Sequence, residues 1–203
     1  MRRRRKIVDA WLSEVARAPH GRLAALLELE ALTHRASFAG GWPIAQRDRA
    51  FAVLSEVARA SGSHDEERSA AIYALRGLFE GRAARTMLEV LRDDRAPPAV
   101  RSDAADGLGY LGPEIVARAR GGLSVAVDVL RGALQDPSPD VRYGALYATG
   151  ELACHALVNE VDALTSDEAV TREGHSVGAE ARATRAYLGT TRVSTGTRAP
   201  SVR

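Results

Sequence analysis

The sequence predicts an all-α fold, an α-α superhelix in which antiparallel helix pairs stack side by side. An arginine recurs along the chain at intervals of 33, 41 and 40 residues, and in the two clearest copies of the repeat it follows a valine. Apolar residues within each copy recur at helical spacing. Alanine and leucine supply most of the apolar residues while aromatics make up only 5%, a mixture that favours closely packed helices.

The repeat is clearest in two segments, 91–109 and 134–150. Both run in the same order: a leucine, an aspartate-proline turn, the valine-arginine pair, spaced alanines and a closing glycine. Weaker copies contain Arg68 and Arg182. Repeats of this length are typical of stacked helical hairpins, whose period is about 40 to 47 residues.

The second of these segments shows why a hairpin is expected. Val141, Ala145, Ala148 and Leu152 are spaced by 4, 3 and 4 residues and share one helical face, which must be buried. The preceding Asp-Pro-Ser-Pro run, 136–139, cannot continue a helix, and its Ser138 or the next Asp140 can cap the following one. One hairpin leaves apolar surface exposed, so its neighbours must stack on it.

This order of residues resembles the HEAT-repeat family, particularly short bacterial HEAT-like repeats of the phycobilisome-lyase type. The resemblance covers about residues 50–189. It implies stacked helical hairpins and, most often, a scaffold that binds a protein.

The expected organisation has three parts. Residues 1–40 form an N-terminal helical cap pair with a basic start, residues 43–189 form about four HEAT-like repeats, and residues 190–203 are too polar to bury a face and form a disordered tail. A Gly-Gly-Trp-Pro run at 40–43 separates the first two parts. Helices are expected at about 5–18, 21–38, 43–61, 65–80, 82–93, 98–111, 113–135, 139–153, 155–165 and 177–189.

Two stretches depart from the repeat. About a dozen extra residues lie around 113–122 and include Arg118 and Arg120, and an irregular stretch covers 170–176. In stacked repeats such additions tend to form loops on one face that take part in binding.

Charge and apolar patterning restrict the class of protein. No apolar run reaches the roughly 18 to 20 residues of a membrane span, and the basic start is not followed by an apolar signal core, so we expect a cytoplasmic protein. Cys154 is the only cysteine, which excludes an intramolecular disulfide. Eight basic residues lie in the two ends, and removing them from the formal +2 leaves residues 7–189 at −6.

The repeat arginines predict a column along the second helices. They are Arg68, Arg101, Arg142 and Arg182. The structural interpretation is a ladder that pairs with turn aspartates such as Asp94, Asp136 and Asp140. The functional alternative is a row that binds anions.

The tyrosines also follow the repeat. Tyr73, Tyr147 and Tyr187 each stand five residues after a repeat arginine, where Asp106 stands in the fourth copy, and they lie off the main core face. One interpretation is that they fill the seams between second helices. The other is an aromatic stripe that binds a partner on the concave surface, joined by Tyr110 and Tyr143 and by the insertion arginines Arg118 and Arg120.

These features favour a non-catalytic protein-protein interaction scaffold, an adaptor or regulatory subunit that holds a protein in its groove. We predict no catalytic, cofactor-binding or metal-binding residue, because the sequence contains no phosphate loop, nucleophile motif or close histidine pair. One alternative is a nucleic-acid-binding HEAT-like protein with a DNA-glycosylase-like fold, which the acidic body disfavours. A tetrapyrrole-protein lyase or chaperone is a further alternative that the resemblance alone implies.

Overall fold

The computed structural model describes residues 2–17, 21–39 and 44–195, and over these ranges the protein is helical apart from turns and one isolated two-residue bridge. The all-α class is therefore confirmed. None of the described helices is both long enough and apolar enough to cross a membrane. The elements, in chain order, are α1 (Arg2–Arg17), α2 (Arg22–Ala39), α3 (Ile44–Arg59), α4 (Asp65–Arg76), α5 (Gly81–Arg92), α6 (Pro98–Val116), α7 (Gly122–Ala133), α8 (Pro139–Glu151), the 3-10 turn η1 (His155–Leu157), α9 (Val158–Ala163) and α10 (Val177–Thr195).

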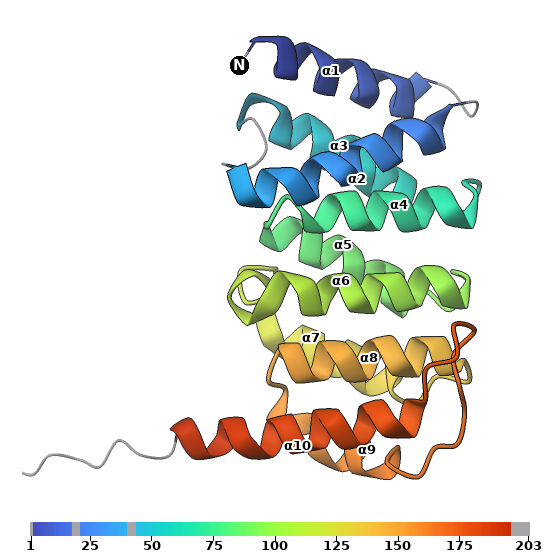
Figure 1. The fold of residues 1–203 in the computed structure, drawn as a ribbon, viewed down its shortest axis with the longest axis vertical. Coiled ribbons are helices and arrows are strands. Elements are labelled where there is room, and N and C mark those ends of the chain that lie inside the picture. The colour runs from blue at the N-terminus through green and yellow to red at the C-terminus, as the bar shows by residue number, and fades with distance from the viewer. Residues whose placement is uncertain (1, 18–20, 40–43, 196–203) are drawn as a thin grey trace, which may run out of the picture.

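The helices form two layers (Figure 1). Helices α2, α4, α6, α8 and α10 pack in sequence against one another in the front layer. Behind them α1, α3, α5 and α7 do the same, and η1 follows α7. Each rear helix also packs on the front helix that follows it in the chain, so the described residues form a stack of five hairpins. We call the outer surface of α4, α6, α8 and α10 the even-helix face.

Small residues let the layers and the neighbouring hairpins approach closely. The buried apolar residues of α4 are three alanines with Ile72 and Leu75, and they join one core that continues along the stack. A Cβ on Gly109 of α6 would lie 2.7 Å from the Tyr147 ring of α8, and one on Gly144 of α8 would lie 2.9 Å from the Ser102 carbonyl of α6. Neither position accepts a side chain without movement, so glycine sets the spacing of α6 and α8.

The turn before α8 differs in detail from the expectation. Pro139 occupies the first turn of the helix and Ser138 has the extended backbone of an N-cap residue, but no side chain caps the helix. The Asp136 carboxylate instead accepts a hydrogen bond from the Ser138 amide at 2.9 Å. The turn is closed by this local contact, which serves the same purpose as a cap.

The expected helix 113–135 is wrong. Gly112 has φ 74° and ψ 168°, and the helical turn from Pro113 to Val116 continues α6 beyond this kink. Gly121 and Gly122 both have positive φ, and α7 begins only there. The extra residues therefore form a separate turn and do not lengthen the next helix, because glycine tolerates a conformation that ends one helix and starts another.

The ends of the predicted segments also shift. The expected helix 155–165 is a 3-10 turn followed by the short α9. Helix α10 extends to Thr195, beyond Gly189 and into the segment expected to be a disordered tail. The start of the expected tail is thus helical, whereas its remainder, 196–203, and the expected separator, 40–43, lie outside the described residues. The expected cap pair α1 and α2 packs directly on α3 and α4 and closes one end of the stack.

Candidate functional site

The four repeat arginines bind backbone carbonyls of the segment that precedes their own helix. Two of them, Arg68 and Arg101, are buried. Because these two guanidinium groups are buried and donate to acceptors within the protein, an anion from solution cannot reach them. The pairs are Arg68 Nε to Ala58 O at 3.0 Å, Arg101 Nε to Ala96 O at 3.0 Å, Arg142 Nη1 to Asp136 O at 2.8 Å and Arg182 Nη1 to Thr165 O at 2.5 Å.

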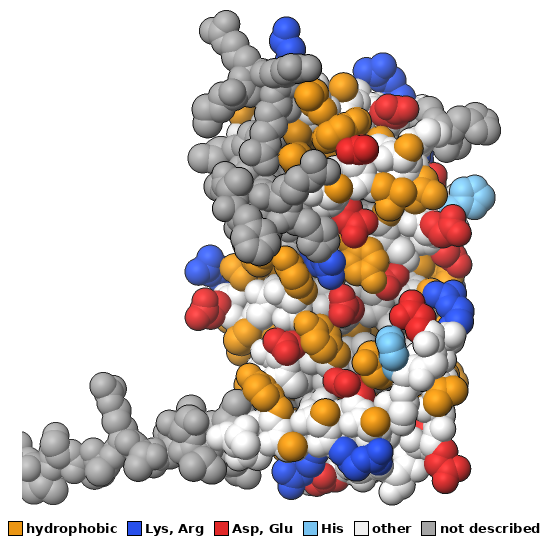
Figure 2. Space-filling view, viewed as in Figure 1, with side chains coloured by type: hydrophobic (Ala, Val, Ile, Leu, Met, Phe, Trp, Pro, Cys, Tyr) orange, Lys and Arg blue, Asp and Glu red, His pale blue; other side chains and the backbone are white. Residues whose placement is uncertain are grey.

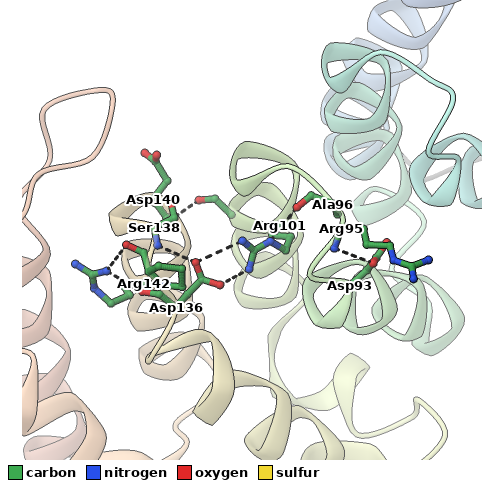
Figure 3. Close-up of polar contacts among 10 residues, drawn as sticks. Asp93, Arg95, Ala96, Arg101, Asp136, Ser138, Asp140 and Arg142 are labelled. Carbon is green, nitrogen blue, oxygen red and sulfur yellow. Dashed lines mark hydrogen bonds and ion pairs between the residues drawn. The ribbon is translucent and has the colours of Figure 1, made fainter.

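The ladder also links neighbouring repeats. Arg101 of α6 forms an ion pair with Asp136 in the turn before α8 (Figure 3), and Arg142 of α8 pairs with Asp167 before α10 at 2.8 Å. Asp94, expected as a third turn partner, is exposed and pairs with none of the ladder arginines in the described part of the chain. The Asp140 carboxylate has a different role, accepting a hydrogen bond from the Arg172 amide at 3.0 Å.

The even-helix face contains a hollow of about 230 Å³ between α4, α6, α8 and the loop before α10. On α6 and α8 its lining residues recur at three- and four-residue steps, so each helix contributes one stripe. Three of the five predicted tyrosines line it. The lining consists of Tyr73, Ala99, Ser102, Asp103, Asp106, Asp140, Tyr143, Gly144, Tyr147, Thr171, Arg172, Glu173 and His175.

At one edge of the hollow a guanidinium is held between two aromatic rings. The Arg76 Cζ atom lies 4.5 Å from the ring centroids of both Tyr73 and Tyr110, and its Nη1 lies 3.1 Å from Asp106 Oδ2. The Tyr73 hydroxyl donates a hydrogen bond to Asp103 Oδ1 at 2.7 Å. Burial and the nearby Asp103 raise the pKa of Tyr73, so this hydroxyl stays protonated.

The other two lining tyrosines differ in their contacts. The Tyr147 ring fills the space above Gly109 in the seam between α6 and α8. Tyr143 stacks on His175 with ring centroids 5.2 Å apart and an interplanar angle of 23°. Burial is the largest cause that raises the pKa of Tyr143, and the negative charge of Glu180 raises it further. Seam packing thus describes Tyr147, whereas Tyr143 lies on the rim of the hollow.

The second sequence insertion forms part of this rim. Val170 and Ser176 pair as an isolated antiparallel bridge, and the Thr171 amide donates to the His175 carbonyl at 2.8 Å. The contact between the Arg172 amide and Asp140 ties the loop to the start of α8. Loop 170–176 therefore places a guanidinium, a carboxylate and an imidazole beside the tyrosines.

The remaining predicted partner-binding residues are not brought to the hollow. Arg118 and Arg120 are exposed, and Arg120 lines a separate depression with residues of α5 and α7, in the other layer. The backbone at Arg118 packs on Gly81 at the start of α5, where a Cβ would lie 2.6 Å from it. Tyr187 is 49% exposed on α10, and Tyr110 lies behind the Arg76 side chain rather than in the lining.

Carboxylates dominate the hollow, which sequence reasoning missed. Among its lining residues four are acidic and one, Arg172, is an arginine. Red side chains gather over α6 and α8 between orange ones, the class that includes tyrosine (Figure 2). Burial raises the pKa of Asp106, Asp103 raises it further, and the Arg76 guanidinium lowers it. The available signal was that Asp106 occupies the repeat position of a tyrosine, with Asp103 one turn before it.

Cys154 has no role in this site. Its side chain is buried at the end of α8, and burial raises the pKa of the thiol to about 11. Among the described residues no group of three or more histidine, cysteine, aspartate or glutamate side chains is arranged to hold a metal ion. No protein-family model matches the chain, and no curated protein matches it.

Proposed function

We propose that this protein is a non-catalytic scaffold, an adaptor or regulatory subunit, that binds a protein partner on the even-helix face. The observation that carries the proposal is the hollow formed by Tyr73, Tyr143 and Tyr147 with four carboxylates. Tyrosine rings provide large contact area at low entropic cost, and they are enriched at the centres of protein interfaces. Polar groups around them supply specificity.

We also propose that the chain is a HEAT-like repeat protein. The equivalence of two repeats supports this: α6 and α8 begin at Pro98 and Pro139, and Arg101 and Arg142 follow three residues later in each. Both arginines bind the turn before their own helix and an aspartate of the next repeat. A stack built this way presents one continuous face to a partner.

The nucleic-acid alternative finds no support on this face. A phosphate backbone requires a surplus of lysine and arginine, whereas the hollow has four carboxylates and one guanidinium. The tetrapyrrole-protein alternative rests on the sequence resemblance alone.

The proposal is tested by affinity purification of the full chain from its native cells with two matched double variants. Tyr143→Ala with Glu173→Ala removes a ring and a carboxylate from the rim of the hollow. Arg92→Ala with Arg120→Ala changes two exposed residues of the depression in the other layer. We expect the partner to be lost from the first variant and retained by the second, with helix content unchanged and a cooperative melting transition in both. A partner that both variants retain equally would overturn the proposal.

A further inference from the structure

We infer that the hollow on the even-helix face receives an arginine side chain from an extended segment of the partner. This inference rests on the proposed function and specifies the chemistry that the face recognises. It is carried by the way the protein holds its own Arg76, by the repeat positions around it and by the charge of the hollow.

Arg76 shows what this face does with a guanidinium. The group lies between the Tyr73 and Tyr110 rings, 4.5 Å from each centroid, and pairs with Asp106 at 3.1 Å. Two aromatic faces and one carboxylate thus surround a planar cation at the edge of the hollow. The arrangement satisfies both the π-stacking and the charge of a guanidinium.

The repeat leaves the next position of this kind without an arginine of its own. Arg76 stands eight residues after Arg68, and the residues eight after Arg101 and Arg142 are Gly109 and Gly150. The Tyr147 ring covers Gly109. Between α6 and α8 the chain therefore supplies an aromatic ring but no guanidinium at this position.

Carboxylates flank this second position. Burial is the largest cause of the raised pKa of Tyr147, and the negative charges of Glu151 and Asp106 raise it further. Asp103, Asp140 and Glu173 add three more around the hollow, against Arg172 in the lining and Arg76, which pairs with Asp106. This surplus of negative charge is complementary to a cationic side chain.

The size of the hollow favours one long side chain, and its chemistry favours arginine. A hollow of about 230 Å³ is below the roughly 300–1,000 Å³ of pockets that enclose whole small ligands, so it suits one long side chain. The guanidinium fork stacks on tyrosine and pairs with two carboxylate oxygens at once, which the compact lysine ammonium does not do. We therefore expect discrimination between the two cations.

The experiment measures fluorescence anisotropy of a labelled peptide of alternating arginine and serine titrated with the full chain. Matched peptides replace every arginine by lysine, by the neutral isostere citrulline or by glutamate. We expect the lysine peptide to bind about tenfold more weakly, which corresponds to about 1.4 kcal/mol, and the other two not to bind. Equal affinity for the arginine and lysine peptides, or for the arginine and citrulline peptides, would overturn the inference.

Two isosteric variants localise the contact. Asp103→Asn with Glu173→Gln removes two charges from the lining while preserving shape, and we expect at least a tenfold loss of arginine-peptide affinity, or about 1.4 kcal/mol. Asp128→Asn on α7 is the control, an exposed carboxylate in the other layer, and it should bind as the unchanged protein does. Melting temperatures establish that each variant is folded. Loss of affinity in the control alone, or in neither variant, contradicts the assignment to the hollow.

The outcomes separate this inference from the proposed function. A partner that depends on the rim of the hollow but is not displaced by the arginine peptide would support the scaffold proposal and overturn the inference that an arginine side chain enters the hollow. Arginine-peptide binding without any rim-dependent partner would do the reverse. Self-association of the protein that is lost in the Asp103→Asn, Glu173→Gln variant would identify a second copy as the occupant and overturn the partner segment.

Discussion

The Arg101 guanidinium of α6 and the Asp136 carboxylate before α8 form an ion pair in which each side chain is less than a tenth exposed, at 8% and 9%. Arg101 Nε is also bound to the Ala96 carbonyl, and Asp136 also accepts the Ser138 amide. One contact therefore closes two turns and joins two repeats.

Replacing Arg101 by alanine should destabilise the protein by about 3–5 kcal/mol, because it removes the counter-ion of a buried carboxylate and the donor to a buried carbonyl. Urea unfolding followed by circular dichroism measures the change. Arg85→Ala is the matched control: its ion pair with Glu89 is exposed, and such pairs contribute at most about 1 kcal/mol. Similar losses in the two variants would argue against a structural role for the ladder.

A methyl group at Gly109 should cost about 1–3 kcal/mol, the range for overpacking a close contact. The added Cβ would meet the Tyr147 ring at 2.7 Å and the Ala148 Cα at 3.2 Å. Gly132 in α7 has no atom within 4 Å of the same position, so Gly132→Ala should stabilise the helix by up to about 1 kcal/mol. Opposite signs in thermal unfolding of the two variants are the expected result, and a neutral Gly109→Ala would contradict the close approach of α6 and α8.

The Cys154 thiol should be almost unreactive in the folded protein. It is 5% exposed and burial raises its pKa from 9.0 to about 11, and only the thiolate reacts with alkylating reagents. Iodoacetamide labelling near neutral pH should therefore be slow until urea unfolds the chain. Since the folded state favours the neutral thiol, this stabilising contribution is present below pH 9.0 and is lost as the pH rises through about 11. Rapid labelling of the folded protein would contradict this burial.

Binding of the arginine peptide should release protons. Burial raises the pKa values of Asp106 and Glu180, and a guanidinium beside a carboxylate lowers its pKa again. Affinity should therefore fall as the pH is lowered into the acid range. The folding stability of the free protein should change with pH in the opposite direction. A carboxyl group whose pKa is raised in the folded state stabilises the fold below its unfolded pKa, and this contribution is lost as the pH rises.

Calorimetry of the same peptide in the acid range, in two buffers of different ionisation enthalpy, detects the released protons. Asp106 faces Asp103, Arg76 and the tyrosines, while Glu180 faces His175 and Tyr143. The Asp103→Asn, Glu173→Gln variant serves as the comparison. An observed enthalpy that does not depend on the buffer would count against binding at these carboxylates.

Local chemistry explains why much of the fold was predictable. The spacing of Val141, Ala145 and Ala148 predicts a buried helical face, and all three are inaccessible. Proline at the start of α6 and of α8 predicts both turns correctly. These features are determined by residues that are close together in the sequence, so their spacing is enough to predict them.

The features that were missed depend on packing between distant segments. The kink at Gly112 and the start of α7 follow from backbone conformations that several glycines nearby could have adopted. The acidic hollow arises only when α6, α8 and loop 170–176 meet. Arg118 and Arg120 also lie in an insertion, but their segment packs toward α5 and away from the hollow. The sequence shows that an insertion is present, but it does not show which helix layer the insertion packs against.

The distance along the chain between Arg101 and Asp136, 35 residues, has a consequence for how the protein is made. As the chain leaves the ribosome, α6 emerges with a cation whose counter-ion has not yet been synthesised. Because a buried, uncompensated charge is strongly unfavourable, α6 can complete its native packing only after the turn before α8 has emerged. The growing end at α6 must therefore stay partly open until the turn before α8 arrives.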